Sequence, residues 1–142
     1  MQISAKTNYA IRALLAIAAS DPVPVKVGML AKEGLPPRFV ENILGELRRS
    51  ELVHSRRGRA GGFTLARPAH EITLGQIVRV VSGPMSEIHG LAEECGPTDP
   101  AARLPAVWNA IMDRVASLLD DLTIADVLLG ELPGDLADLG DN

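Results

Sequence analysis

The sequence has a single cysteine among its 142 residues, Cys95, and this excludes several kinds of site. One thiol cannot form a disulfide within the chain, and by itself it cannot build a thiolate zinc site or an iron–sulfur site. No apolar run approaches the roughly 18 uninterrupted residues that suggest a membrane-spanning helix. Residues 1–20 mix apolar positions with Lys6 and Arg12 and lack a small-residue cleavage site, so we expect a cytoplasmic protein without membrane association.

Catalytic motifs are also missing. The sequence contains no glycine-rich phosphate loop, no nucleophile elbow and no paired carboxylates at catalytic spacing. Its 3 histidines, His54, His70 and His89, are scattered along the chain. His89 and Glu93 are four residues apart with Cys95 nearby, but an isolated set of this kind is more often plain surface than a metal site. We therefore predict that the protein is not an enzyme.

Charge is distributed unevenly along the chain. Residues 1–68 hold 11 Lys and Arg against 5 Asp and Glu, a net charge of +6, whereas residues 69–142 hold 3 against 13, a net charge of −10. A basic half is typical of a phosphate-binding surface, while an acidic half would repel DNA and is expected to face away from it. Chance clustering of charge on a protein surface is the alternative, so the motifs must decide.

The basic half begins with two predicted helices. At 142 residues and 46% hydrophobic content, the chain suits one compact domain with an appended element. After Ser4, a good N-cap residue, apolar residues recur at helical spacing up to the stop signal Asp21-Pro22. A second, short helix is expected over 27–33, because Gly34 is the residue type found just past helix ends.

A third helix is predicted over residues 36–49, where Pro36 and Pro37 can only begin a helix. Its buried stripe is expected to hold Phe39, Val40, Ile43, Leu44 and Leu47. Its outer face is expected to hold Arg38, Glu41, Asn42, Gly45, Glu46, Arg48 and Arg49. Two short helices around a glycine, the second polar and partly basic on its free side, match a helix-turn-helix.

A hairpin with a basic, glycine-rich turn is predicted next. Residues 52–56 and 63–66 alternate as strands do, and they flank the turn 57–62. Taken alone, this would be a surface hairpin with solvated arginines. Its position directly after the helix pair favours the wing of a winged helix, with Arg56, Arg57 and Arg59 at the minor groove or adjacent phosphates.

The acidic half contains two further helical segments. Thr73 and Gln76 have capping-box spacing before a predicted helix that runs through Val81 and ends at Gly83. Later, apolar residues step alternately by four and three: Leu104, Trp108, Ile111, Val115, Leu118 and Leu122. We expect this seam to form a homodimer interface anchored by Trp108, the alternative being packing against the chain's own winged domain.

The expected fold is therefore mainly α with a small β-hairpin wing. Thr123 has capping spacing at the start of a last short helix that ends at Leu129. We predict a winged helix-turn-helix DNA-binding domain over 1–83, a sensing loop over 84–102, dimerisation helices over 103–129 and a flexible acidic tail over 130–142.

Five motifs, in order, resemble the BadM/Rrf-two family of bacterial transcription regulators. They are ISAK at 3–6 with YAIRAL at 9–14, FVENIL at 39–44, RG at 57–58 with GGF at 61–63, EITL at 71–74, and LTIAD at 122–126. The resemblance covers about residues 2–129 and implies a homodimeric winged-helix repressor or activator. It also implies that Glu41 and Arg57 read the operator.

The chain departs from the cluster-binding members of that family. Those members carry three cysteines in the loop before the long helix, where this chain has only Cys95, and some use an acidic ligand where this chain has Asn8. Even a dimer offers two thiolates, fewer than a cluster usually needs. We expect no iron–sulfur cluster, and the chain looks closer to the cluster-free branch that resembles the cysteine-metabolism repressor.

The predicted partner is double-stranded DNA with a palindromic operator. Base edges are expected to be reached by Arg38, Glu41 and Asn42, which can bond guanine, cytosine and adenine respectively. Phosphate contacts are expected from Arg48, Arg49, Arg56 and Arg59. Arg57 and Gly58, which open the hairpin turn, complete the expected set of DNA-binding residues. Together with the apolar seam and the family resemblance, these contacts lead us to expect a homodimeric, sequence-specific bacterial regulator that acts as a repressor.

The 84–102 loop is expected to adjust operator affinity through a small ligand, a partner protein or the redox state of Cys95, with His89 as a further sensing residue. Glu93 and Glu94 flank the thiol and disfavour its ionisation, so oxidation ranks below ligand or partner binding, and an inert surface cysteine is the remaining alternative. A different class of function, a protein-interaction module that regulates a partner enzyme, is disfavoured by the basic hairpin tip.

Overall fold

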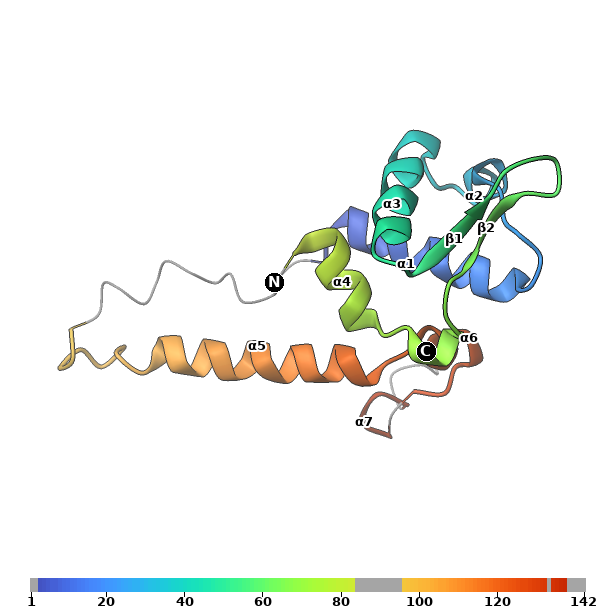
Figure 1. Ribbon diagram of the computed structural model, residues 1–142. Helices are drawn as coiled ribbons and strands as arrows, with labels where there is room; N and C mark the ends of the chain where they lie inside the picture. Colours follow the sequence, from blue (N-terminus) through green and yellow to red (C-terminus); the bar gives the residue numbers. More distant parts are fainter. Residues whose placement is uncertain (1–2, 84–95, 133, 138–142) are drawn as a thin grey trace.

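The computed structural model describes residues 3–83, 96–132 and 134–137. Its elements, in order, are α1 (Ala5–Ser20), α2 (Val27–Lys32), α3 (Pro37–Arg49), β1 (Val53–Arg56), β2 (Gly62–Leu65), the 3₁₀ helix η1 (Ala69–Glu71), α4 (Leu74–Ser82), α5 (Leu104–Asp121), α6 (Ile124–Leu129) and α7 (Gly134–Ala137). Figure 1 shows a winged-helix domain built from α1 to α4, with the long helix α5 extending away beneath it. The predicted mainly helical fold with a hairpin wing is confirmed.

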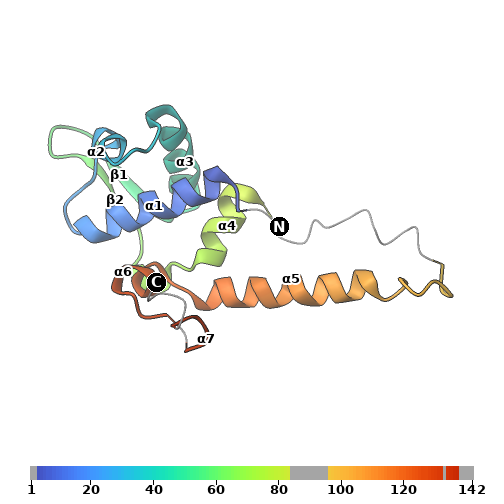
Figure 2. The same ribbon diagram turned by 180° about the vertical axis from the view of Figure 1, so that it is seen from behind.

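The first helix lies at the centre of the core. α1 begins at Ser4, whose Oγ accepts a hydrogen bond from the amide of Thr7 at 3.1 Å. Helices α3, α4 and α6 and strand β2 all pack against α1 (Figure 2). Its buried apolar side chains are Ala10, Ala13, Leu14 and Ile17. The rest of the core cluster is Val25, Leu30, Leu35, Val40, Ile43, Leu44, Leu47, Leu52, Val53, Ile72, Ile77, Val81 and Ile124.

The hairpin is fixed to the segment that precedes α2. β1 and β2 pair antiparallel, with Arg56 opposite Gly62 next to the turn. The amide of Val25 donates to the Phe63 carbonyl at 2.9 Å, and the Phe63 amide donates back to the Val25 carbonyl at 2.8 Å. At Gly62, φ is +146° and a Cβ would lie 2.7 Å from the Val25 carbonyl oxygen, so only glycine fits there.

Capping boxes begin both α4 and α6, as predicted. The Thr73 hydroxyl accepts from the amide of Gln76 at 3.2 Å, and the Gln76 side chain accepts from the Thr73 amide at 3.1 Å. In the same way, the Thr123 hydroxyl accepts from the amide of Asp126 at 3.1 Å, and the Asp126 carboxylate accepts from the Thr123 amide at 2.9 Å. Hydrogen bonds from the backbone and then the hydroxyl of Thr123 hold the pKa of Asp126 below its ordinary value.

The chain returns to the winged-helix domain after α5, although residues 103–129 were expected to form a separate dimerisation segment. The amide of Leu74 donates to the Leu122 carbonyl at 2.8 Å, and the amide of Ile124 donates to the Ile72 carbonyl at 2.9 Å. Leu122 is only 6% exposed, and α6 packs against α1 and η1. Within the predicted dimerisation segment 103–129, α6 therefore packs with the first domain, and only α5 extends from it.

Helix α5 exposes its apolar side chains. Leu104, Val107, Trp108 and Ile111 are 42–49% exposed, and no residue of α5 is fully buried. Its main neighbour among the described elements is α4, and its N-terminal half lies away from the winged-helix domain in both ribbon views. The short helix α7 lies in the segment predicted to be a flexible tail. Among the described residues, no helix is both long and apolar enough to cross a membrane.

Candidate nucleic-acid interface

Helices α2 and α3 form the helix-turn-helix. The turn between them contains Gly34, whose φ of +85° lies in the left-handed region that favours glycine. The amide of Leu35 donates to the Leu30 carbonyl at 3.3 Å, and Leu35 itself is buried. Pro37 then occupies the first turn of α3, where its missing amide hydrogen costs nothing. The two helices pack against each other.

The free face of α3 carries the predicted base-contacting side chains. Val40, Ile43, Leu44 and Leu47 are buried and hold the opposite face against the core. Arg38, Glu41 and Asn42 are exposed, and they lie in the first two turns of the helix. Beside them is an open hollow of about 440 Å³, lined by Lys6, Phe39, Glu41, Asn42, Ile43, Gly45, Glu46 and Arg49. This face can therefore present a carboxylate, an amide and guanidinium groups to base edges.

One residue predicted for the buried stripe of α3 is not buried. Phe39 is 40% exposed, and its ring meets that of Tyr9 in α1 edge to face. The prediction was wrong because Phe39 lies at the border of the apolar stripe in the first turn, where α1 covers only one side of the ring. Phe39 instead forms part of the rim of the hollow on the free face of α3.

A residue predicted for the outer face, Glu46, joins α3 to α1. Lys6 Nζ lies 2.9 Å from Glu46 Oε1, and both side chains are about one-third exposed. The second carboxylate oxygen, Oε2, is buried and accepts no hydrogen bond from the described residues. Sequence reasoning missed this pair because the two residues are 40 positions apart. The pair links the N-terminal end of α1 to α3.

The hairpin turn presents the predicted arginines to solvent. Arg56, Arg57, Gly58 and Arg59 are all exposed. Gly58 has a φ of +103°, which suits glycine. A Cβ at Gly61 would collide with the Arg56 carbonyl oxygen, so the tight turn requires glycine there too.

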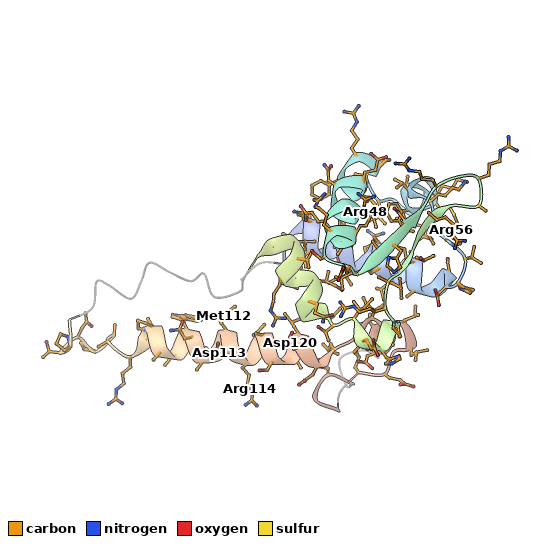
Figure 3. All side chains as sticks on the ribbon, viewed as in Figure 1. Arg48, Arg56, Met112, Asp113, Arg114 and Asp120 are labelled. Atoms are coloured by element: carbon orange, nitrogen blue, oxygen red, sulfur yellow. The ribbon has the colours of Figure 1, made fainter. Side chains whose placement is uncertain are left out.

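Helix α3 and the hairpin also make direct contact. Arg48 Nη1 donates to the Ser55 hydroxyl at 3.4 Å, which links the C-terminal end of α3 to β1. Figure 3 shows Arg48 and Arg56 on these neighbouring elements, in the winged-helix domain and away from α5. Among the described residues, none of Arg38, Arg48, Arg49, Arg56, Arg57 and Arg59 is in an ion pair. Their charges are therefore available to phosphate groups.

The remaining predicted site residues are only partly placed. Cys95 and His89 lie outside the described residues. Leu104, Trp108 and Ile111 are exposed on α5, whereas Val115 and Leu118 are partly buried. Leu122 is buried inside the chain's own core, so it has little side chain left for a partner.

Comparison with known proteins gives a consistent result. The family model described as "Rrf2: Iron-dependent Transcriptional regulator" matches residues 3–129. A protein of Mycobacterium tuberculosis (strain ATCC 25618 / H37Rv), described as an HTH-type transcriptional regulator, is 40% identical over 145 residues, which cover 100% of this chain and 90% of that protein. The HTH-type transcriptional regulator CymR of Bacillus subtilis (strain 168) is 32% identical over 130 residues, covering 89% of each protein.

Solved structures agree with the sequence matches. The structure of CymR, the global cysteine regulator of B. subtilis, superposes with a TM-score of 0.79 at 31% identity, covering 92% of this chain and 98% of that one. The structure of IscR from T. potens superposes with a TM-score of 0.74 at 28% identity, covering 92% of this chain and 88% of that one.

Proposed function

The chain belongs to the Rrf2 family of transcriptional regulators, and we propose that it is a homodimeric bacterial repressor that binds a palindromic operator in the cytoplasm. Each protomer would place α3 in the major groove and the hairpin turn at the adjacent minor groove or phosphates. Arg38, Glu41 and Asn42 would contact base edges, and the arginines of the hairpin would contact the minor groove or the backbone.

The observation that carries this proposal is the common location of α3 and the hairpin. Both lie at one end of the molecule, and Arg48 in α3 bonds Ser55 in β1 (Figure 3). The half of the sequence that builds this end has a net charge of +6, whereas the half that contains α5 has a net charge of −10. A basic end that carries a helix and a wing suits the phosphate backbone of DNA, and the acidic helix α5 lies away from it.

The dimer is supported by the exposed apolar residues of α5. Four large apolar side chains in its first two turns are 42–49% exposed. A second copy related by a two-fold axis would cover the same side chains on both protomers. Trp108 is the expected anchor, because large aromatic side chains dominate the energy of such interfaces.

The family description names iron, but the donor set of this chain does not fit an iron–sulfur cluster. The sequence has 1 cysteine, so a dimer would bring two thiolates, fewer than the usual cysteine set. Among the described residues, which do not include Cys95, no three His, Cys, Asp or Glu side chains come together. The proposed function therefore involves no cluster.

The signal that controls binding is proposed to act through the 84–102 loop. This loop connects α4 of the DNA-binding domain to α5, the helix of the proposed dimer interface. A change in the loop would therefore alter the relative position of the two DNA-binding domains in the dimer. A small ligand or a partner protein ranks above direct oxidation of Cys95, because Glu93 and Glu94 disfavour the reactive thiolate.

Selection of duplexes from a random pool tests the proposal. The purified chain should enrich an inverted repeat whose half-sites lie an integral number of duplex turns apart. A pool that stays random after several rounds would contradict sequence-specific binding and would favour a protein-interaction module. Arg57→Ala, run in parallel, should enrich operator sequences more slowly, because it removes a DNA-contacting guanidinium from the hairpin turn.

A further inference from the structure

The direction of α5 depends on few contacts with the winged-helix domain. No side chain of α5 is fully buried, and its main neighbour among the described elements is α4. Near its C-terminal end, Asp120 accepts two hydrogen bonds from Arg79 of α4, Nη1 to Oδ1 at 2.7 Å and Nη2 to Oδ2 at 2.6 Å. A bidentate pair of this kind restricts orientation as well as distance. Figure 3 labels Asp120 on the part of α5 that lies next to α4.

The ion pair occupies space that only a glycine leaves free on α4. Gly75 lies one turn before Arg79 on the same face of α4 and is buried. A Cβ at this position would collide with Asp120 Oδ1 and would lie 3.2 Å from Arg79 Nη1. The presence of glycine here is explained by the space that the ion pair needs.

The ion pair and the chain after it hold one end of α5. The hydrogen bond from Arg79 lowers the pKa of Asp120. Two residues after Asp120, the Leu122 carbonyl accepts from the amide of Leu74 at 2.8 Å. These contacts lie at the C-terminal end of α5, whereas the exposed Leu104 and Trp108 lie toward the other end.

A small change of angle at the held end becomes large at the free end. α5 has 18 residues, so it is about 27 Å long at the usual rise per residue. A rotation of about 5° would displace its far end by about 2 Å. If the far end pairs with a second copy, the angle between α4 and α5 decides how far apart the two α3 helices lie.

We infer that Arg79 and Asp120, packed over Gly75, are positioning residues that set the spacing of the two operator half-sites. This inference rests on the proposed dimeric operator binding. Neither residue belongs to the predicted DNA contacts on α3 and the hairpin. Their side chains are 45% and 42% exposed, so the pair contributes little to the free energy of folding and can be removed without unfolding the domain.

Two variants remove the pair by different routes. Asp120→Asn removes the charge, and Gly75→Ala displaces the carboxylate while leaving both charged residues in place. Asp121→Asn is the matched control, since it makes the same chemical change at the next exposed position, which has no ion pair among the described residues. Each protein is titrated against a series of duplexes that carry the selected half-sites with one base pair added or removed between them.

The wild type and Asp121→Asn should bind the duplex with the preferred spacing about tenfold more tightly than the other duplexes. In both pair variants, this ratio of affinities should fall to about threefold or less, or a duplex with another spacing should become the preferred one. Affinity for a single half-site and the sedimentation mass should stay unchanged. An unaltered spacing preference in both pair variants would overturn the inference while leaving the dimeric repressor intact. A wild-type monomer, or a wild type that selects no operator, would instead overturn the proposed function and this inference with it.

Discussion

Tyr9 and Phe39 meet edge to face, with their ring centroids 5.7 Å apart and their planes at 84°. The pair joins α1 to the first turn of α3 and thus positions the end of α3 that carries Arg38 and Glu41. An aromatic pair of this geometry contributes about 0.5–1.5 kcal/mol beyond the area it buries.

We expect a double-mutant cycle of Tyr9→Leu and Phe39→Leu to measure this coupling in urea unfolding. Each single variant should lower the free energy of unfolding, and the cycle should return about 1 kcal/mol of interaction. A coupling energy near zero would mean that the two rings stabilise the fold independently.

The hairpin turn should contribute to affinity through charge. Arg57→Ala removes an exposed guanidinium that is expected to neutralise one phosphate. The affinity of the wild type for its operator should fall by orders of magnitude between about 50 and 200 mM salt. In a plot of log affinity against log salt concentration, the slope for the variant should be smaller in magnitude by about one. Fluorescence anisotropy across a salt series measures both slopes. An Arg57→Ala variant with unchanged affinity and slope would contradict the assignment of the hairpin as a DNA-binding wing.

Glu41 should contribute to discrimination between bases. Its carboxylate is exposed on the free face of α3, where it can accept a hydrogen bond from a cytosine amino group. Glu41→Ala should relax the preference at one base position by about 1–3 kcal/mol and change overall affinity less, because it also removes a negative charge near phosphates. Competition assays with single-base variants of the operator check this. Equal weakening at every position would point to a structural role for Glu41.

The cap of α6 should make stability depend on pH at the acid end. Asp126 has a lowered pKa in the folded chain, so it stabilises the fold above its ordinary pKa, and this contribution is lost as pH falls through the folded value. The melting temperature of the wild type should therefore fall below about pH 4. Asp126→Asn should show a shallower fall, while Asp113→Asn, an exposed change in α5, should follow the wild type. If the melting temperatures of the wild type and Asp126→Asn fall identically with decreasing pH, this carboxylate has no such role.

Local signals in the sequence predicted much of the fold. Thr73 and Thr123 were identified as caps because a capping box needs only residues within one turn, and both are present. The third helix was predicted because its buried residues recur at helical spacing, and it spans Pro37–Arg49. The fold and family were therefore predictable from short-range patterns and their order.

Contacts between distant residues were not predictable in this way. The return of the chain to the core at Leu122 depends on hydrogen bonds between residues 122–124 and 72–74. The cap at Thr123 predicts that a new helix begins there, but no local pattern says which element Leu122 packs against. Arg79 and Asp120 are 41 positions apart, and either one alone is an ordinary surface charge. Gly75 was the one available signal, because a glycine inside a predicted helix indicates a close approach of another element.

We propose that two copies of the chain, joined through α5, bind one operator. Analytical ultracentrifugation of the wild type with the selected duplex tests it most directly, and Trp108→Asp provides the comparison because this side chain is already 42% exposed in the single chain. We predict that the wild type sediments as two chains per duplex, and that Trp108→Asp sediments as a folded monomer that no longer binds the full operator tightly. A wild type that stays monomeric at micromolar concentration and binds the duplex one to one would contradict the claim.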